Sequence, residues 1–255
     1  MKYTTFILTM ACLLAFTACK KNSTDTANAT EKENWISLFN GENLDGWEIK
    51  IRNYPLGENF ANTFRVENGL LVVSYDGYEN DFQERFAHIY THNDYSHYKL
   101  RIEYRFVGEP CPGAPRWAYA NNGAMLHAQN PASMAIDQDF PNSIEAQMLA
   151  SDDIIGNRHT GSVCTPGTYV SINGEPEHQH CISSDSKFYP MGEWVTMEIE
   201  VYGDSLVRHI VNGDTVMTYT ALRLDNGDVL HSGRIALQGE GHPTEFRKIE
   251  ILELK

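Results

Sequence analysis

Three short segments of the chain, residues 122–129, 143–148 and 238–242, carry polar side chains at every second position. Alternate positions of a β-strand point to the same face, so each segment would present its polar groups together. The side chains concerned are those of His127, Glu145, Gln147, Gln238, Glu240 and His242. If the three strands are neighbours in one sheet, these acids, imidazoles and amides converge on one surface. Such a set can move protons and hold hydroxyl groups, as a sugar-processing site requires.

Each of these residues also has a purely structural interpretation. A lone glutamate that alternates along a strand usually faces solvent, and a lone histidine usually makes a structural hydrogen bond. The functional interpretation gains support because three strands show the same pattern, and both interpretations stay open at this point.

Further candidate ligand-binding residues lie outside these segments. Trp117 and Tyr119 follow a Pro/Gly-rich loop, where aromatic rings can stack on sugars or cap the core. Arg247 could hold a carboxylate or another ligand oxygen, or form a surface ion pair. A weak metal-binding signal comes from His159, His178 and His180. The sequence contains no Gly-rich phosphate loop, no Gly-x-Ser-x-Gly elbow and no His-Glu-x-x-His helix.

The elements that position these residues are predicted to be β-strands. Period-two alternation is clearest in residues 99–106 and 193–202, and no long stretch keeps the 3.6-residue period of a helix. The predicted strands are 64–74, 87–92, 99–106, 123–129, 143–150, 193–202, 205–211, 215–219, 233–238 and 246–254. Asn212-Gly213 predicts a tight hairpin turn. This pattern favours an all-β fold, a two-sheet antiparallel β-sandwich or jelly roll.

Composition limits the classes of protein that fit. The 255 residues are 42% hydrophobic, which is enough to bury a sizeable core. The formal net charge of −14 argues against binding to nucleic acid, because phosphate recognition needs a basic surface. No composition shift divides residues 35–255, so one domain is predicted there.

The start of the chain is predicted to be a lipoprotein signal peptide over residues 1–19. Residues 6–16 are apolar but too short to span a bilayer, and they lead into Thr17-Ala18-Cys19, which resembles a bacterial lipoprotein box. Cys19 would be the lipidated residue, and the alternative is a plain secretory signal. Residues 20–34 are small and polar and are predicted to form a flexible tether. The protein is therefore expected in the cell envelope, with the membrane contacted through its lipid anchor.

The remaining cysteines fit an exported protein. Cys164 and Cys181 flank a segment rich in Gly, Pro and Asn, as the two ends of a hairpin would. We expect them to form a disulfide in an oxidising compartment. Cys111 would then be a free thiol.

The chain resembles the 3-keto-disaccharide hydrolase domain family over about residues 35–254. Residues 35–47 (WISLFNGENLDGW) resemble the opening signature of that family, and the later matches follow in the same order. These matches are Asn122-Gly123 with Met125 and His127, Glu145-Ala146-Gln147, Gly192-Glu193-Trp194, the turn at 211–213, and residues 233–249 from Gly233 through Glu240 and His242 to Arg247.

The resemblance implies a concanavalin A-like jelly roll that cleaves glycosides already oxidised to a ketone at C3. A base removes the acidified C2 proton, the enolate expels the C1 substituent, and water can add to the resulting glycal. On this hypothesis Glu145 or His127 is the base, while Gln147 and Gln238 position hydroxyl groups. Glu240 and His242 would supply a second acid/base function. A divalent metal ion is a further possibility, with His127, Glu145 and His242 as candidate ligands.

Two alternatives stay open from the sequence. One is a conventional glycoside hydrolase in which Glu145 and Glu240 are the paired carboxylates. The other is a non-catalytic glycan-binding lipoprotein on the same sandwich, because a fold does not determine a function.

Overall fold

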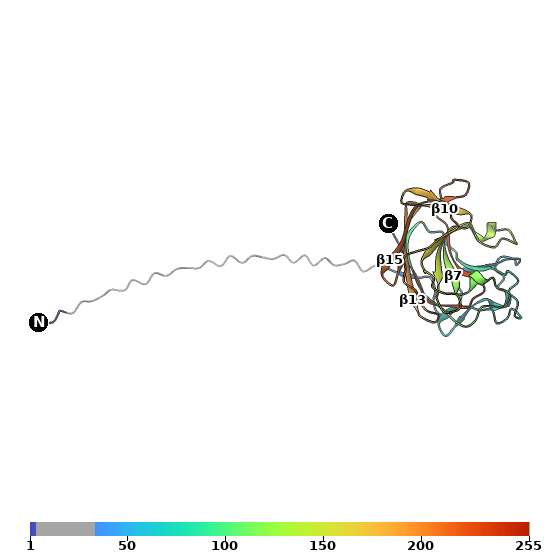
Figure 1. Ribbon diagram of the computed structural model, residues 1–255, viewed down its shortest axis with the longest axis horizontal. Helices are drawn as coiled ribbons and strands as arrows, with labels where there is room; N and C mark the ends of the chain where they lie inside the picture. The colour runs from blue at the N-terminus through green and yellow to red at the C-terminus, as the bar shows by residue number, and fades with distance from the viewer. Residues whose placement is uncertain (4–33, 255) are drawn as a thin grey trace. The chain divides into compact units, whose positions relative to one another are not determined.

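The computed structural model describes residues 1–3 and 34–254 of the chain (Figure 1). The chain divides into two units, Met1–Glu33 and Asn34–Lys255, and the second unit holds every named strand. Almost all of the predicted signal peptide and tether, Cys19 included, lies outside the described residues. No helix in the described part of the chain is both long enough and apolar enough to cross a membrane.

Residues 34–254 form two antiparallel sheets packed face to face, as the all-β prediction requires. The ten-stranded sheet has the order β11 (Glu175–Glu177), β10 (Thr168–Ile172), β15 (Asp214–Leu224), β14 (Leu206–Val211), β13 (Val195–Tyr202), β6 (His97–Phe106), β17 (Thr244–Glu253), β4 (Leu70–Val73) and β3 (Phe64–Glu67), with β1 (Ile36–Ser37) also paired to β17. The seven-stranded sheet has the order β12 (Cys181–Ile182), β9 (Ser162–Cys164), β8 (Ile144–Leu149), β7 (Asn121–Ala128), β16 (Arg234–Gly239), β5 (Ala87–Thr91) and β2 (Trp47–Ile51). Three short 3₁₀ helices, η1 (Phe60–Asn62), η2 (Arg116–Ala118) and η3 (Pro131–Ser133), lie in the connections.

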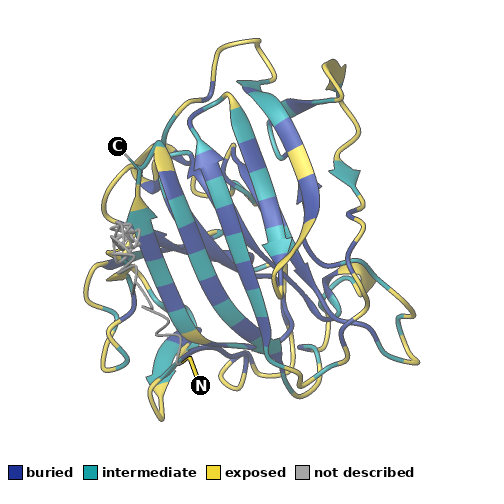
Figure 2. Cartoon of the chain, turned by 90° about the vertical axis from the view of Figure 1, so that its left-hand side faces the viewer, coloured by how far each residue is buried: buried dark blue, intermediate teal, exposed yellow. Residues whose placement is uncertain are grey.

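The core lies between the sheets because each strand alternates apolar and polar residues. In β6 and β13 the inward side chains, such as Ile102 and Ile199, are fully buried. The outward side chains between them are charged and form ion pairs, for example Arg101 with Glu198 at 2.8 Å. Figure 2 shows this alternation of buried and partly exposed positions along the strands of the ten-stranded sheet. The predicted two-sheet sandwich is therefore confirmed.

Turn residues set the hairpins. The predicted tight turn joins β14 to β15, where Val211 pairs with Asp214 and both Asn212 and Gly213 have positive φ angles of 47° and 90°. Two such residues in succession give the hairpin turn whose twist matches that of the strands. The single strand predicted over 64–74 is wrong, because a turn at Asn68-Gly69 divides it into β3 and β4.

The predicted disulfide is confirmed. Cys164 in β9 and Cys181 in the edge strand β12 are directly paired across the ladder and form the bond. Cys111 is a buried free thiol.

We expect removal of this disulfide to destabilise the domain. The bond closes a loop with a sequence separation of 17 residues, and such a constraint on the unfolded chain stabilises a protein by about 3 kcal/mol. The Cys164→Ser, Cys181→Ser variant should therefore lose about 3 kcal/mol of unfolding free energy in urea titrations. Cys111→Ala is the control and should cost less. Identical urea midpoints for the wild type with and without reductant would contradict the expectation.

Candidate active site

The three segments with alternating polar residues are adjacent strands of the seven-stranded sheet, in the order β8, β7, β16. Glu145 in β8 pairs with Met125 in β7, and Met125 pairs with Ala236 in β16. Directly paired residues point to the same face, so the three strands share one polar face. The opposite side chains, including Ala124, Ile144 and Leu237, belong to the core between the sheets. The prediction that these strands lie side by side is confirmed.

A glycine in the middle strand lets two of these polar side chains meet. Gly123 pairs with Gln147 and lies beside Gln238, which is two residues along from Ala236. A Cβ atom added at Gly123 would lie 2.6 Å from Gln238 Oε1 and from Glu145 Cγ, and closer still to Glu145 Oε1. The carboxyl group of Glu145 and the amide of Gln238 therefore fold over the bare backbone at Gly123. Any larger residue at this position would separate them.

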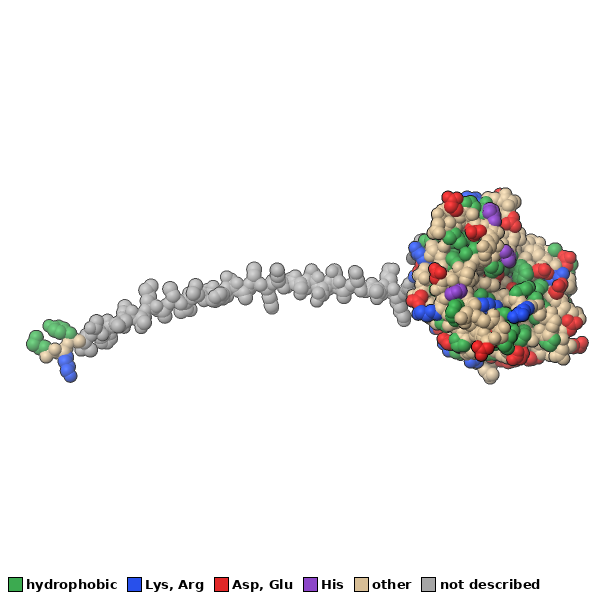
Figure 3. Space-filling model, in the orientation of Figure 1, with side chains coloured by type: hydrophobic (Ala, Val, Ile, Leu, Met, Phe, Trp, Pro, Cys, Tyr) green, Lys and Arg blue, Asp and Glu red, His purple; other side chains and the backbone are tan. Residues whose placement is uncertain are grey.

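This face holds a cavity of about 600 Å³. Its lining includes Asn121, Glu145, Gln147, Leu149 and Glu240 from the sheet and the following turn, Trp117, Phe140, Ile155 and Arg158 from loops, and Cys164, Pro166, His180 and Cys181 around the disulfide. In the view of Figure 3, hydrophobic side chains gather in the middle of the domain and acidic side chains are spread around them. The volume suits a small ligand such as a sugar ring with part of its substituent.

Aromatic rings form one wall of the cavity. Trp117 is 48% exposed and stacks on Phe86, with ring centroids 5.7 Å apart and planes 16° apart. The ring of Phe140 lies 5.0 Å from that of Phe86 and 6.4 Å from that of Trp117, measured between centroids. An exposed indole held by stacking presents a flat apolar surface at low entropic cost, which suits the apolar face of a sugar ring. Trp117 therefore lines the cavity, and its contact with a ligand stays a prediction.

Two carboxyl groups lie together in the cavity. Glu145 and Glu240 are 6% and 3% exposed. Burial raises the pKa of Glu145 to about 8, although the neighbouring side chain of Gln238 lowers this pKa. Burial also raises the pKa of Glu240 well above its ordinary value, and the charge of Glu145 raises it further. Both carboxyls therefore favour the protonated form near neutral pH, and Glu145 loses its proton first as the pH rises through about 8, which leaves one proton on the pair.

Several buried polar atoms in this region have no hydrogen-bond partner among the described residues. They are Asn121 Oδ1, Glu145 Oε1, Gln238 Oε1 and Nε2, and Glu240 Oε2. Buried polar groups in folded proteins are almost always hydrogen-bonded, and each exception needs a cause. Three of these atoms, on Asn121, Glu145 and Glu240, belong to residues that line the cavity, and they are the ones suited to bond to a polar ligand.

Arg158 supplies a fixed positive charge to the lining of the cavity. Its Nη2 donates to the carbonyl oxygens of Tyr119, Ala120 and Ala150 at 2.5, 2.8 and 2.9 Å, and its Nε donates to Ala150 at 3.2 Å. Burial lowers its pKa to about 10, and Asp152 opposes that shift, so the guanidinium stays charged at neutral pH. Among the described residues, none accepts a hydrogen bond from Nη1. That group is free to bond to a ligand oxygen.

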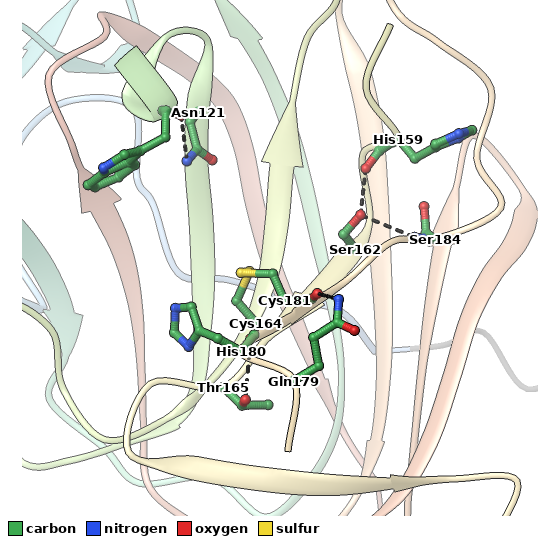
Figure 4. Close-up of a disulfide and its surroundings, with 10 residues drawn as sticks. Asn121, His159, Ser162, Cys164, Thr165, Gln179, His180, Cys181 and Ser184 are labelled. Carbon is green, nitrogen blue, oxygen red and sulfur yellow. Dashed lines mark hydrogen bonds between the residues drawn. A yellow bond between two sulfur atoms is a disulfide. The ribbon is translucent and has the colours of Figure 1, made fainter. Parts of the chain in front are cut away.

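The disulfide forms the remaining wall. Figure 4 shows the ring of His180 beside the Cys164–Cys181 bond, on the side that carries Asn121. The carbonyl oxygen of His180 accepts a bond of 2.9 Å from the amide of Thr165, which fixes the backbone there. His180 itself is exposed at the rim of the cavity.

The structure places His127 elsewhere, so the prediction that it shares a face with Glu145 is wrong. The ladder between β7 and β16 shifts register between Arg234 and Ala236, and His127 has a φ angle of 48°. This bulge breaks the alternation after Met125. The ring packs against Tyr98 of the other sheet at 6.1 Å, and its Nδ1 lies 3.2 Å from the carbonyl oxygen of Leu230.

His242 and Tyr119 lie behind the cavity instead of lining it. Strand β16 ends at Gly239, and Gly241 has a φ angle of 113°. The side chains of Glu240 and His242 therefore do not point to the same face, as alternate residues of a strand would. The His242 ring packs on Phe106 at 5.8 Å and on Tyr119 at 5.1 Å. The Tyr119 hydroxyl donates to Asp152 at 2.5 Å and so braces the loop that carries Arg158.

Arg247 is not part of the cavity either, and its predicted contact with the ligand is wrong. It lies on β17 of the ten-stranded sheet, where it pairs with Glu103 and covers the ring of Trp194 at 4.5 Å. The proposed metal ligands His127, Glu145 and His242 are not brought together. Nowhere in the described part of the chain do three His, Cys, Asp or Glu side chains gather as a metal site would need.

Sequence reasoning missed Asn121, Phe140 and Arg158. Asn121 has the parity of Gly123 and Met125, so extending the strand by two residues would have found it. Phe140 and Arg158 lie on loops, where no periodic signal exists to place them.

Buried histidines make the domain sensitive to acid. Burial lowers the pKa of His88 to about 3 and the pKa values of His127, His209 and His242 to about 4. The unfolded chain takes up protons near pH 6.5 while the folded chain does not, so stability is lost as the pH falls from about 6.5 to 4. A histidine with a pKa of about 4 costs about 3 kcal/mol at the acid end.

This loss is measurable by urea unfolding between pH 6.5 and 4. The measurement is best made in the Glu145→Gln, Glu240→Gln double variant. In the wild type the raised pKa values of these two carboxyls increase the stability as the pH falls, which would mask the loss caused by the histidines. A constant unfolding free energy across this range would contradict the prediction.

Fold and cavity together define a jelly-roll domain with a paired-carboxylate pocket on the outer face of one sheet. The model of the 3-keto-alpha-glucoside-1,2-lyase-like domain family matches residues 34–252, and the chain belongs to that family. No curated protein sequence matches the chain.

Solved structures support the fold. One is a protein from Parabacteroides distasonis ATCC 8503 that is named as a putative glycosyl hydrolase. It has a TM-score of 0.56 and 18% sequence identity, and the match covers 87% of this chain and 100% of the Parabacteroides chain. A Bacillus subtilis protein of unknown function with a galectin-like fold has a TM-score of 0.52 at 9% identity, covering 82% of this chain and 90% of its own.

Proposed function

We propose that this protein cleaves glycosides whose sugar ring already carries a ketone at C3, with Glu145 as base and Glu240 as acid. The observation that carries the proposal is the pair of buried carboxyl groups with raised pKa values in one cavity. The family to which the chain belongs supports the substrate class.

The reaction balances with these two groups. The C3 ketone makes the C2 proton acidic, and the carboxylate of Glu145 takes that proton. The electron pair first forms an enolate on the C3 oxygen. The ketone then re-forms, a C1–C2 double bond appears, and the C1–O bond breaks. Glu240 gives its proton to the departing oxygen, and water can add later across the double bond.

The electrostatics suit this division of roles. A general base works best when its pKa lies near the working pH, and burial raises the pKa of Glu145 to about 8. The nearby charge of Glu145 raises the pKa of Glu240 further, so Glu240 keeps its proton when Glu145 has lost one. One proton shared by two carboxyls is the state that the elimination needs.

The rest of the cavity supplies binding and charge stabilisation. Nη1 of Arg158 is the group suited to the enolate oxygen, since the guanidinium is fixed before the reaction by its bonds to three carbonyl groups. Asn121 and Gln147 offer amide groups to ring hydroxyls, and Trp117 offers a stacking surface. Gln238 is fully buried beside Glu145 and positions that carboxyl group.

The test is incubation of the purified domain with 3-keto-glycosides while the released alcohol is measured, with and without a chelator. We expect release, together with loss of deuterium from substrate labelled at C2. Binding without product would support the non-catalytic alternative and overturn the proposal.

A conventional glycoside hydrolase also uses two carboxyl groups, so Glu145 and Glu240 support that second candidate. The two differ in substrate. Turnover of the unoxidised glycoside with retention of the C2 deuterium would favour the conventional hydrolase.

We also propose that the protein acts in the cell envelope, anchored by lipid at Cys19. The support is the sequence of residues 1–19 and the disulfide, which suits an oxidising compartment. Metabolic labelling with a fatty-acid analogue should mark the wild type and leave Cys19→Ser unmarked. Equal labelling of both would rule this out.

A further inference from the structure

The turn that follows β16 carries Glu240 and Gly241 and leads the chain from the seven-stranded sheet into β17 of the ten-stranded sheet. Oε2 of the Glu240 carboxyl is buried and bonds to no described residue. The position of this carboxyl in the cavity therefore depends mainly on the backbone that carries it. What holds the turn in place also determines where Glu240 lies.

Both backbone polar groups of Gly241 are hydrogen-bonded. Its N–H donates to the hydroxyl of Tyr75 at 2.7 Å, and its carbonyl oxygen accepts from the N–H of Cys111 at 2.7 Å. Its φ angle is 113°, and an added Cβ atom would lie 2.6 Å from that of Ala114, so glycine is required at this position. Of the two hydrogen bonds, only the bond to Tyr75 involves a side chain. A substitution can therefore remove it and leave the backbone unchanged.

Tyr75 reaches this turn from the opposite sheet, because it lies two residues after the end of β4. Its side chain is buried, and its ring packs edge-on against Tyr78 at 5.0 Å and Phe82 at 5.8 Å, which fixes the position of the hydroxyl. Burial raises the pKa of Tyr75 well above its ordinary value, and the charge of the nearby Glu240 acts in the same direction. The hydroxyl is therefore neutral at physiological pH.

We propose that Tyr75 is a positioning residue, whose hydroxyl holds the turn at Gly241 so that the carboxyl of Glu240 reaches the leaving oxygen of the substrate. The inference rests on the proposed function, in which Glu240 protonates that oxygen. Tyr75 does not line the carboxylate cavity. It lines a different hollow of about 430 Å³, together with Cys111 and Pro243. Tyr75 therefore acts through the turn and does not touch the substrate.

The experiment compares two substrates that differ in their need for an acid, methyl 3-keto-α-glucoside and 4-nitrophenyl 3-keto-α-glucoside. Methoxide is a poor leaving group and must be protonated as it departs, whereas 4-nitrophenolate is stable as the anion. A general acid contributes about 10²–10⁴-fold where the leaving group needs it. Tyr75→Phe should therefore lose at least about tenfold in kcat/KM on the methyl glycoside and less than about threefold on the 4-nitrophenyl glycoside.

Tyr78→Phe is the matched control. Tyr78 packs against Tyr75 in the same aromatic cluster, and its buried hydroxyl also lies 2.7 Å from one partner, the hydroxyl of Thr63. Each variant removes one buried hydroxyl from that cluster, so both should lower the urea midpoint. Only Tyr75→Phe should change the ratio of kcat/KM between the two substrates.

Two further variants act at the turn itself. Glu240→Gln removes the acid and should show the same dependence on the leaving group with a larger loss. Gly241→Ala places a methyl group against Ala114 and displaces the turn without altering Tyr75. It should change the ratio between the substrates in the same direction, and it provides the test if Tyr75→Phe does not fold.

The outcomes separate the two proposals. Equal effects on both substrates in Tyr75→Phe, or an equal change of the ratio in Tyr78→Phe, would overturn the positioning role and leave the proposed activity in place. A loss in Glu240→Gln that does not depend on the leaving group would overturn the acid role of Glu240 and the role of Tyr75 with it. A wild type that cleaves neither substrate would overturn the proposed function.

Discussion

The Glu145→Gln variant should lose at least about a thousandfold in kcat/KM on a 3-keto-glycoside, while it still folds. A positioned general base contributes about 10²–10⁴-fold to a proton transfer, and glutamine keeps the shape of the side chain without the basic oxygen. Wild-type kcat/KM should also rise with pH through about 8, as Glu145 loses its proton. The residual activity of the variant should lack that rise.

The Glu145→Gln substitution should raise the free energy of unfolding while it lowers the activity. The folded pKa of Glu145 lies above its unfolded value near 4.5, so the carboxyl loses stabilising effect as the pH rises from about 4.5 to 8. Glu145→Gln should therefore unfold at higher urea than the wild type at pH 8 and show less of this gain at pH 4.5. A variant that is inactive and also less stable at pH 8 would point to a structural role.

Glu48 provides a matched control for this experiment. It lies on β2 at the far end of the row that runs from Glu145 through Met125, Ala236 and Tyr90. It occupies the same face of the same sheet but does not line the cavity. Glu48→Gln should keep kcat/KM within about twofold, and a comparable loss in both variants would contradict the assignment of the base.

The Gly123→Ala variant should reduce kcat/KM by at least about a hundredfold, because misplacing a reacting group by about 1 Å has an effect of that size. The added methyl group would meet Glu145 and Gln238. Both are side chains that can rotate away, so the cost in stability should be small while the geometry of the site is lost.

Gly239→Ala is the control on the other face of the sheet. A Cβ atom there would lie 3.2 Å from Val73 and 3.3 Å from Ala87, inside the core. It should lower the urea midpoint more than Gly123→Ala does. If Gly123→Ala retains full activity, the meeting of Glu145 and Gln238 over Gly123 has no part in the reaction.

The sheet that carries the site could be predicted because alternation is a local property of a strand. Glu145, Gln147 and Gln238 share a face as their parity requires, and β8, β7 and β16 are neighbours. Parity does not report irregularities, however. His127 was misplaced because a bulge at a non-glycine residue leaves no signature in the sequence.

Neither the sheet to which a strand belongs nor the path of a loop could be predicted in advance. Arg247 lies on β17, and period-two alternation does not say that this strand belongs to the ten-stranded sheet. Arg158 reaches the cavity from a loop whose path depends on bonds to the carbonyl groups of residues 119, 120 and 150. Such long-range contacts exist only once the chain has folded.

The position of the disulfide in the cavity wall links assembly of the site to the redox state of its surroundings. Newly made protein in a reducing cytosol would carry two thiols where the mature protein has a covalent tie between β9 and the two-residue edge strand β12. The wall that bears His180 would then be held by hydrogen bonds alone, those of the short ladder and the bond from Thr165 to the His180 carbonyl. With the activity and the cell-envelope location proposed above, full activity would therefore develop only after the chain meets an oxidant.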